Sequence, residues 1–194
     1  MNMCSKKLVK VSERQFSINL ANGIFMSKLL YGIQIWGLAA KYLLQKVQVL
    51  QNKAARITQG YSSYKLDTVT LLKHMNWLSV NQLVILHVSI LVHNIIHTGE
   101  PAYFYDRIVR IQNSCTRTNM GKKLGQKPSD IGNSVFTRDQ FCSKSFDIYN
   151  QLPSQITSII EKNKFKKYLK QFLYDNNDLP DPNLYPVFGL NSGL

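Results

Sequence analysis

Residues 41–59 are KYLLQKVQVLQNKAARITQ, and this stretch gives the clearest indication of the fold class. Its apolar side chains recur at steps of four and three residues, at Leu43, Val47, Leu50, Ala54 and Ile57. This spacing places them in one stripe along an α-helix. The stretch therefore predicts a helix from Lys41 to Gln59 with one apolar face.

The polar side of this predicted helix carries basic residues on one flank. At about 100° per residue, Lys46, Lys53 and Arg56 project at neighbouring angles. A row of this kind can follow the phosphates of a nucleic-acid backbone. Charges that merely solvate a helix surface are the other interpretation, and the spacing leaves both open.

A second helix is predicted ahead of this one. Ser12 followed by Gln15 resembles a capping box, and apolar residues recur after it near helical spacing, at Phe16, Leu20, Ile24, Leu29 and Ile33. Gly23 and Gly32 are weak points in this pattern. They either end the helix or allow another backbone to approach closely, and the sequence does not choose between these alternatives.

The central core helix is predicted from a capping pattern and a long apolar segment. Ser79 with Gln82 forms another capping box, and the apolar segment that follows continues to His97 and stops at Gly99. A helix that is apolar on most sides is buried on most sides. This segment is therefore expected at the centre of the fold.

Two more helices are predicted towards the C-terminus. One covers Arg138–Tyr149 and is closed by Asn150, ahead of Leu152–Pro153. The other is a basic amphipathic helix with the stripe Phe165, Leu169 and Phe172. The overall prediction is a mainly α protein, a helical bundle with a long basic loop and an irregular C-terminal tail.

The charge balance favours polyanionic partners. Twenty-four Lys and Arg residues against eleven Asp and Glu residues give a formal net charge of +13. A charge this far from zero favours nucleic acid or an anionic surface as a partner. Two stretches hold no acidic residue, Arg14–Leu66 and Arg107–Ser129, and they are the best candidate electropositive surfaces.

The sequence argues against a catalytic or metal site. Its acidic residues stand singly, without the paired carboxylates that two-metal phosphoryl transfer needs, and the polymerase signature Tyr-x-Asp-Asp is absent. His93 and His97 are four residues apart, as in a metal pair, but without further ligands nearby they favour a packing or capping role. No catalytic residue, metal or cofactor is expected.

The cysteine content and the apolar runs indicate a compartment. Three cysteines, far apart in the sequence, do not make a disulfide framework, which favours an intracellular setting, nuclear or cytoplasmic. The N-terminus lacks the apolar region of a signal peptide. The longest apolar run, Leu83–Ile96, is too short to span a bilayer, so no membrane partner is expected.

Several motifs together resemble one family. They are FMSKLLYGIQIWG at 25–37, LQNKAAR at 50–56, NWLSVNQ at 76–82, PAY at 101–103, FDIYNQLP at 146–153 and FK at 165–166. In this order they resemble the region after the palm in jockey-like non-LTR retrotransposon reverse transcriptases, over roughly residues 14–175. After Gly37 the family usually has a second small residue, where this chain has Leu38.

The resemblance implies binding rather than bond-making. It implies a helical thumb, which holds a template–primer duplex by its backbone, over residues 1–100. The expected remainder is a basic loop or linker at 101–135, a C-terminal helical segment at 136–175 and an acidic, proline-containing tail at 176–194. The endonuclease, the fingers and the palm with its metal-binding aspartates are not in this sequence. The chain is therefore expected to be a non-catalytic fragment of an RNA-directed DNA polymerase.

The predicted nucleic-acid contacts combine the helix and the basic loop. They are Lys28, Lys41, Lys46, Lys53, Arg56, Arg107, Arg110, Arg117, Lys122 and Lys123. Tyr31, Trp36, Trp77 and Pro153 are assigned to packing. The expected partners are RNA, DNA or an RNA–DNA hybrid, and a catalytic reverse transcriptase core is a candidate second partner. Two alternatives stay open, a helical protein-interaction scaffold and a retrotransposon relic without function.

Overall fold

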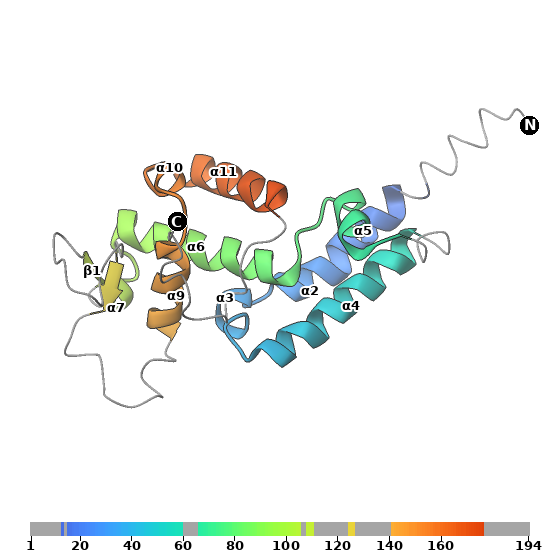
Figure 1. Ribbon diagram of the computed structural model, residues 1–194, viewed down its shortest axis with the longest axis horizontal. Helices are drawn as coiled ribbons and strands as arrows, with labels where there is room; N and C mark the ends of the chain where they lie inside the picture. The colour runs from blue at the N-terminus through green and yellow to red at the C-terminus, as the bar shows by residue number, and fades with distance from the viewer. Residues whose placement is uncertain are drawn as a thin grey trace, which may run out of the picture. The chain divides into compact units, whose positions relative to one another are not determined.

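Helices dominate the computed structural model, which describes residue 13 and residues 15–59, 66–105, 108–110, 124–126 and 141–176. In this described part, two short strands pair with each other and the other regular elements are helical (Figure 1). The predicted mainly α class is therefore confirmed. Ser12 and the tail from residue 177 lie outside the described residues.

The chain divides into two compact units, which we describe separately. The first unit holds Met1–Ile33 and Ala39–Leu83, and the second holds Gln34–Leu38 and Val84–Leu194. The division falls within α6, Val80–Thr98. The predicted partition at residues 100, 135 and 175 concerns functional segments and stays a prediction.

The two glycines of the first helical stretch have different roles. Residues 15–21 are helical and continue through η1, Asn22–Met26, into α2, Ser27–Leu30. Gly23 lies inside η1, a π-helical turn, and a Cβ at this position would meet nothing within 4 Å. Gly32 follows α2 with a φ of 63°, a left-handed value that favours glycine. Gly32 therefore ends the helix, whereas Gly23 neither ends it nor admits a close neighbour.

Trp77 joins the π-helical turn to the residues before α6. Its Nε1 donates to Oδ1 of Asn22 at 2.7 Å, and its ring stacks on Phe25 with centroids 6.0 Å apart. The packing role predicted for Trp77 is confirmed, because only 5% of it is exposed.

The packing role predicted for Tyr31 is wrong, since this residue is 85% exposed. It is the C-cap of α2, with extended backbone at a ψ of 115°. The other two residues assigned to packing, Trp36 and Pro153, are both half-buried.

Helix α4, Lys41–Gln59, is followed by α5, Thr68–His74, which is capped at both ends. Asp67 accepts a hydrogen bond from the backbone N–H of Val69 at 3.1 Å, as an N-cap does. At the other end Asn76 takes a φ of 55°, and the N–H of Trp77 donates to the carbonyl of Leu72 at 2.9 Å. This is a Schellman closure with asparagine in the left-handed position.

The capping box predicted ahead of α6 is confirmed. Oε1 of Gln82 accepts from the backbone N–H of Ser79 at 3.0 Å, and Oγ of Ser79 accepts from the N–H of Gln82 at 3.3 Å. Gly99 ends the helix as predicted, with a φ of 73°. The expectation that the apolar run Leu83–Ile96 is too short to span a bilayer is corrected, because within the described residues α6 is long and apolar enough by length and composition alone. Of its apolar 18-residue window, 61% is buried inside the fold, and the core helix of a soluble protein passes the same test.

The long loop predicted at 101–135 is corrected in part. It contains α7, Ala102–Tyr105, and two strands, β1 (Ile108–Arg110) and β2 (Leu124–Gln126). The strands pair antiparallel, with Val109 opposite Gly125. Three-residue strands are too short to show alternation in the sequence, and their pairing joins positions far apart along the chain. The sequence pattern therefore did not reveal them.

The second unit continues with α9 (Phe141–Asn150), α10 (Ser154–Thr157) and α11 (Lys162–Asp175). Helix α9 ends at Asn150, the residue predicted to close it. The side chain of Asn150 binds both backbone groups of Leu124, accepting from its N–H at 2.9 Å and donating to its carbonyl at 2.8 Å. In this way β2 is attached to the end of α9.

Candidate nucleic-acid interface

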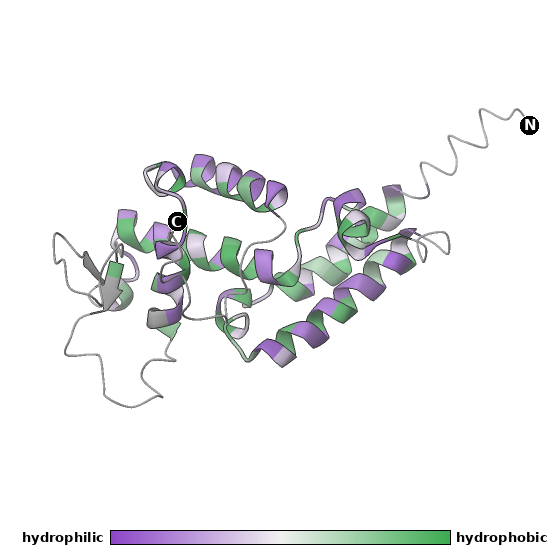
Figure 2. Ribbon diagram, in the orientation of Figure 1, coloured by the Kyte–Doolittle hydropathy of each residue, from purple (hydrophilic) through white to green (hydrophobic). Residues whose placement is uncertain are grey.

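Helix α4 has the predicted bounds but buries a different face. Its buried residues are Leu44, Gln51 and Ala55, at 3%, 0% and 0% exposure. Members of the predicted apolar stripe are instead exposed, Leu43 by 40%, Leu50 by 55% and Ile57 by 78%. Hydrophobic and hydrophilic residues alternate along α4 in Figure 2. The expectation that the stripe forms the packed face is therefore corrected.

Two glutamines explain which face is buried. Nε2 of Gln51 donates to the carbonyl of Leu78 at 2.9 Å, and Oε1 of Gln48 accepts from the N–H of Val80 at 2.8 Å. These bonds attach α4 to the start of α6, where the first backbone N–H groups have no partner within their own helix. Both glutamines lie outside the predicted apolar stripe, because the position of a glutamine in the sequence does not reveal a buried partner.

The rotation of α4 leaves an apolar row on its surface. Leu43, Leu50 and Ile57 are spaced by seven residues, so they lie on one side of the helix, and we call them the α4 apolar row. All are large and exposed. Scattered exposed apolar residues are ordinary, but contiguous ones mark interaction surfaces.

Two of the predicted basic residues lie beside this row. Lys46 and Lys53 are exposed, and they also stand seven residues apart, on the neighbouring side of α4. Nζ of Lys46 lies 5.7 Å from the ring centroid of Tyr42, one turn earlier, within cation–π range. Arg56 differs, because it is half-buried and takes part in contacts within the chain. Lys46 and Lys53 are therefore the members of the predicted ridge that solvent can reach fully.

The structure places only some of the remaining predicted contact residues. Lys41 is exposed at the first residue of α4, and Lys28 is exposed in α2. Arg110 lies in β1, where only the backbone is described. The others lie outside the described residues and stay predictions, namely Arg107, Arg117, Lys122 and Lys123.

The surroundings of the α4 lysines are electropositive. Residues 15–59 contain no Asp or Glu. The carboxylate of Asp67, nearby in sequence, is used as the N-cap of α5. Within the described part of the chain neither Lys46 nor Lys53 has an ion pair. Their charges are thus available to an anion.

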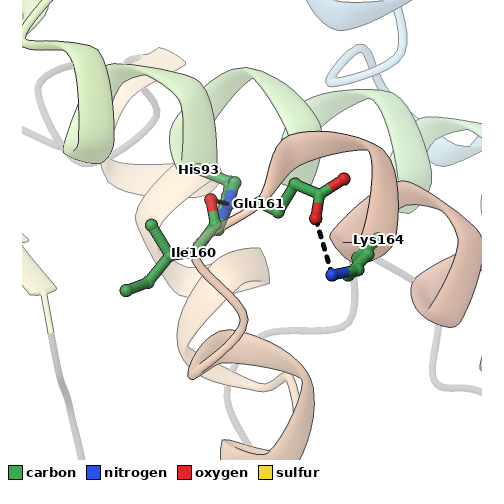
Figure 3. Close-up of polar contacts among 4 residues, drawn as sticks. All are labelled: His93, Ile160, Glu161 and Lys164. Atoms are coloured by element: carbon green, nitrogen blue, oxygen red, sulfur yellow. Dashed lines mark hydrogen bonds and ion pairs between the residues drawn. The ribbon is translucent and has the colours of Figure 1, made fainter.

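His93 and His97 are brought together, but His93 is committed to the fold. Their ring centroids are 4.3 Å apart. Nδ1 of His93 lies 3.2 Å from the hydroxyl of Tyr149, and its Nε2 lies 3.2 Å from the carbonyl oxygen of Ile160 (Figure 3). The carbonyl can only accept, so Nε2–H donates and Nδ1 accepts from the tyrosine. Among the described residues no group of three or more His, Cys, Asp or Glu could hold a metal ion.

Burial also shifts the pKa of each partner in this cluster. Burial is the largest cause that lowers the pKa of His93, its hydrogen bond to Ile160 opposes the shift, and the charge of His97 adds a smaller lowering. Burial raises the pKa of Tyr149 to about 12. With the pKa of His93 lowered and that of Tyr149 raised, both groups are neutral near pH 7, and this is the state in which Nδ1 of His93 can accept from the tyrosine hydroxyl.

One comparison with known proteins supplies a relationship. Over 60 residues the chain is 43% identical to a probable RNA-directed DNA polymerase from transposon BS of Drosophila melanogaster. Over these 60 residues the chain is related to that RNA-directed DNA polymerase from a transposon. The match covers 31% of this chain and 6% of that protein. No family model matches the sequence, and no solved structure matches the chain.

Proposed function

We propose that this retrotransposon-related chain is a non-catalytic, thumb-like part of a jockey-like reverse transcriptase, and that it binds the backbone of RNA, DNA or a hybrid. The similarity to an RNA-directed DNA polymerase supports the ancestry. The exposed lysines of α4 support the binding role. Binding rather than bond-making is proposed because the acidic residues stand singly in the sequence, whereas phosphoryl transfer by two metals needs paired carboxylates.

The observation that carries the proposal is the position of Lys46 and Lys53. Both are exposed, and seven residues separate them, which is about 10 Å along the helix axis. They project from a stretch, residues 15–59, that contains no acid. A phosphate backbone is a linear array of negative charges, and neutralising it releases counterions, which makes binding favourable and dependent on salt.

The test is binding of the full chain to an RNA–DNA hybrid across a salt series. The double variant Lys46→Gln/Lys53→Gln is expected to bind more weakly, and the slope of log K against log salt should fall by about 2, since each neutralised phosphate contributes about 0.9. Arg56 is left unchanged because it is half-buried, and its loss would disturb packing.

The matched control is Lys46→Arg/Lys53→Arg, which keeps both charges at the same places. This variant should retain the salt slope of the unchanged chain. If the glutamine variant is folded and its salt slope is unchanged, Lys46 and Lys53 do not contact the nucleic acid. A chain that aggregates instead of folding would favour the interpretation of a relic.

The α4 apolar row favours a second candidate function, a protein-interaction scaffold. Leu50 and Ile57 are exposed by 55% and 78%, and together with Leu43 they place three large apolar side chains along one side of α4. Apolar surface gathered in this way favours an interaction role. Lys46 and Lys53 border the row. The fitting partner is an amphipathic helix with an apolar row and acidic flanks, because its charges would complement these lysines.

The two functions are separated by substitutions on the same helix. Leu50→Ser/Ile57→Ser removes apolar surface and leaves every charge of α4 in place. If α4 binds a protein partner through its apolar row, association of the chain with itself or with that partner, measured by sedimentation, should persist at high salt. The same association should disappear in the serine variant. If α4 serves nucleic acid, the serine variant should keep the salt slope that the glutamine variant loses.

A further inference from the structure

Packing accounts for the apolar stripe of α11. Phe165, Leu169 and Leu173 are 0% exposed, so the buried stripe ends in Leu173 rather than in the predicted Phe172, which is half-buried. The ring of Phe165 stacks on His93 of α6 with centroids 3.9 Å apart and planes 3° from parallel. Helix α11 lies along α6 in Figure 1. The apolar residues of α11 thus serve the core of the second unit.

The outward face of α11 is strongly basic. Five of its fourteen residues are exposed lysines, Lys162, Lys164, Lys166, Lys167 and Lys170. Hydrophilic residues cover this side in Figure 2. Glu161 pairs with Lys164 at 2.8 Å (Figure 3), and Asp175 accepts from Gln171 at 3.0 Å. Within the described residues the other four lysines have no acidic partner, and we call these four the α11 lysine face.

This arrangement of charge works against the helix that carries it. The first turn of α11 contains no acid and begins with Lys162, although the positive end of the helix dipole disfavours cations there. Lys162 and Lys166 are four residues apart, as are Lys166 and Lys170, and like charges at this spacing repel each other. Solvation of a helix surface does not require this crowding, because uncharged polar residues would solvate it without repulsion.

The field of the α11 lysine face reaches the neighbouring helix. The pKa of His87, on α6, is lowered by burial and secondarily by the charge of Lys166. Lys166 therefore lies close enough to α6 for its charge to be felt there.

We propose that the α11 lysine face is a second binding site, which takes the phosphates of a nucleic-acid backbone. Phosphates that lie between the lysines remove the repulsion among them. The free energy of this repulsion in the unbound helix therefore adds to the free energy of binding. An anionic membrane is a poorer occupant, because a helix that inserts into the headgroup region needs an exposed apolar face, and that of α11 is buried. The site shares its ligand class with the proposed α4 interface but does not depend on it.

The test uses the full chain, with α4 unchanged, and an RNA–DNA hybrid across a salt series. Lys166→Gln/Lys167→Gln/Lys170→Gln is expected to reduce the slope of log K against log salt by about 2 to 3, at about 0.9 for each phosphate that is no longer neutralised. Lys166→Arg/Lys167→Arg/Lys170→Arg keeps the charges and should keep the slope. The glutamine variant should melt at the same or a higher temperature, because it removes repulsion, so weaker binding cannot come from unfolding.

The possible outcomes separate the two sites and the two kinds of ligand. A folded glutamine variant with an unchanged slope would overturn the proposal. So would a variant that loses binding to phosphatidylserine vesicles while hybrid binding is unchanged, because the face would then serve a lipid surface. If substitutions on α4 leave the slope unchanged and those on α11 reduce it, the α4 interface fails and the α11 site stands. The opposite pattern retains α4 and removes α11.

Discussion

Gln51 on α4 donates from Nε2 to the backbone carbonyl oxygen of Leu78 at 2.9 Å. The glutamine is 0% exposed and Leu78 is 2% exposed, so this hydrogen bond lies in the core of the first unit. It attaches α4 to the residues that lead into α6. Together with the hydrogen bond from Val80 to Gln48, it sets which face of α4 is buried, and Lys46 and Lys53 lie on the exposed side.

The first prediction concerns this bond. Gln51→Leu keeps a side chain of similar size but removes the donor, which leaves the buried carbonyl of Leu78 without it. The free energy of unfolding should fall by about 1–3 kcal/mol, the usual cost of an unsatisfied buried polar group. Urea denaturation measures this change. Gln45→Leu, on the exposed side of α4, is the control and should change the stability little. Equal effects of both substitutions would contradict the assigned role.

The second prediction is a dependence of stability on pH through His93. Its pKa is lowered in the folded chain, chiefly by burial, from an ordinary value of 6.5. Below that value the unfolded chain binds more protons than the folded one. The stabilisation is therefore fully present above pH 6.5 and is lost as the pH falls through the lowered pKa of the folded state. His87 has the same direction of shift and adds to the effect.

The measurement is the free energy of unfolding in urea between about pH 5 and pH 8, where histidines titrate. His93→Gln should be less stable at every pH, because it loses the stacking on Phe165, and should show a shallower dependence on pH. Gln45→Ala, which changes no titratable group and lies at an exposed position of α4, is the control and should retain the wild-type dependence. A pH dependence that His93→Gln leaves unchanged would show that His93 does not carry it.

The third prediction is that Lys166 tunes His87. Lys166→Gln removes the positive charge that contributes to the lowered pKa of His87, so this pKa should rise. The rise should be partial, because burial is the larger cause and remains. NMR titration of the imidazole protons measures it. Lys167→Gln, on the next residue of α11, is the control. If the two variants give the same His87 titration curve, the charge of Lys166 does not act on His87.

The fourth prediction concerns the hydrogen bonds between Asn150 and Leu124. Asn150→Ala removes both side-chain hydrogen bonds to the backbone of Leu124. The amide hydrogen of Leu124 should therefore exchange faster, by about 5-fold if the local stability falls by about 1 kcal/mol and by about 30-fold if it falls by about 2 kcal/mol. Hydrogen exchange followed by NMR measures the rate. Asn150→Asp keeps the acceptor for that N–H and should have a smaller effect. Gln151→Ala, at an exposed position, should have none. Equal exchange in all three variants would refute the pairing.

Local patterns predicted the long helices α4 and α6 and the end of α9, but not the short helices α5, α7 and α10. The bounds of α4, the capping box of Ser79 with Gln82 and the ends of α6 and α9 agree with the structure. These features depend on interactions between residues a few positions apart, which the sequence contains directly. The predicted nucleic-acid contacts stay predictions, and the structure adds that Lys46 and Lys53 are exposed and Arg56 is half-buried. The sequence pattern left the lysines of α11 out of the predicted contacts, because charge on an amphipathic helix is usually solvation.

The sequence by itself determined the bounds of α4, the ends of α6 and α9 and the excess of positive charge, because capping, apolar spacing and composition are local properties. Only the tertiary structure decided which face of each helix is buried. On α4 the hydrogen bonds of Gln48 and Gln51 to the start of α6 place two glutamines inward and leave Leu50 and Ile57 exposed. The physical reason is that a polar side chain is buried only where it finds a hydrogen-bond partner. The partners of Gln48 and Gln51 lie about 30 residues away along the chain, so local sequence does not reveal them.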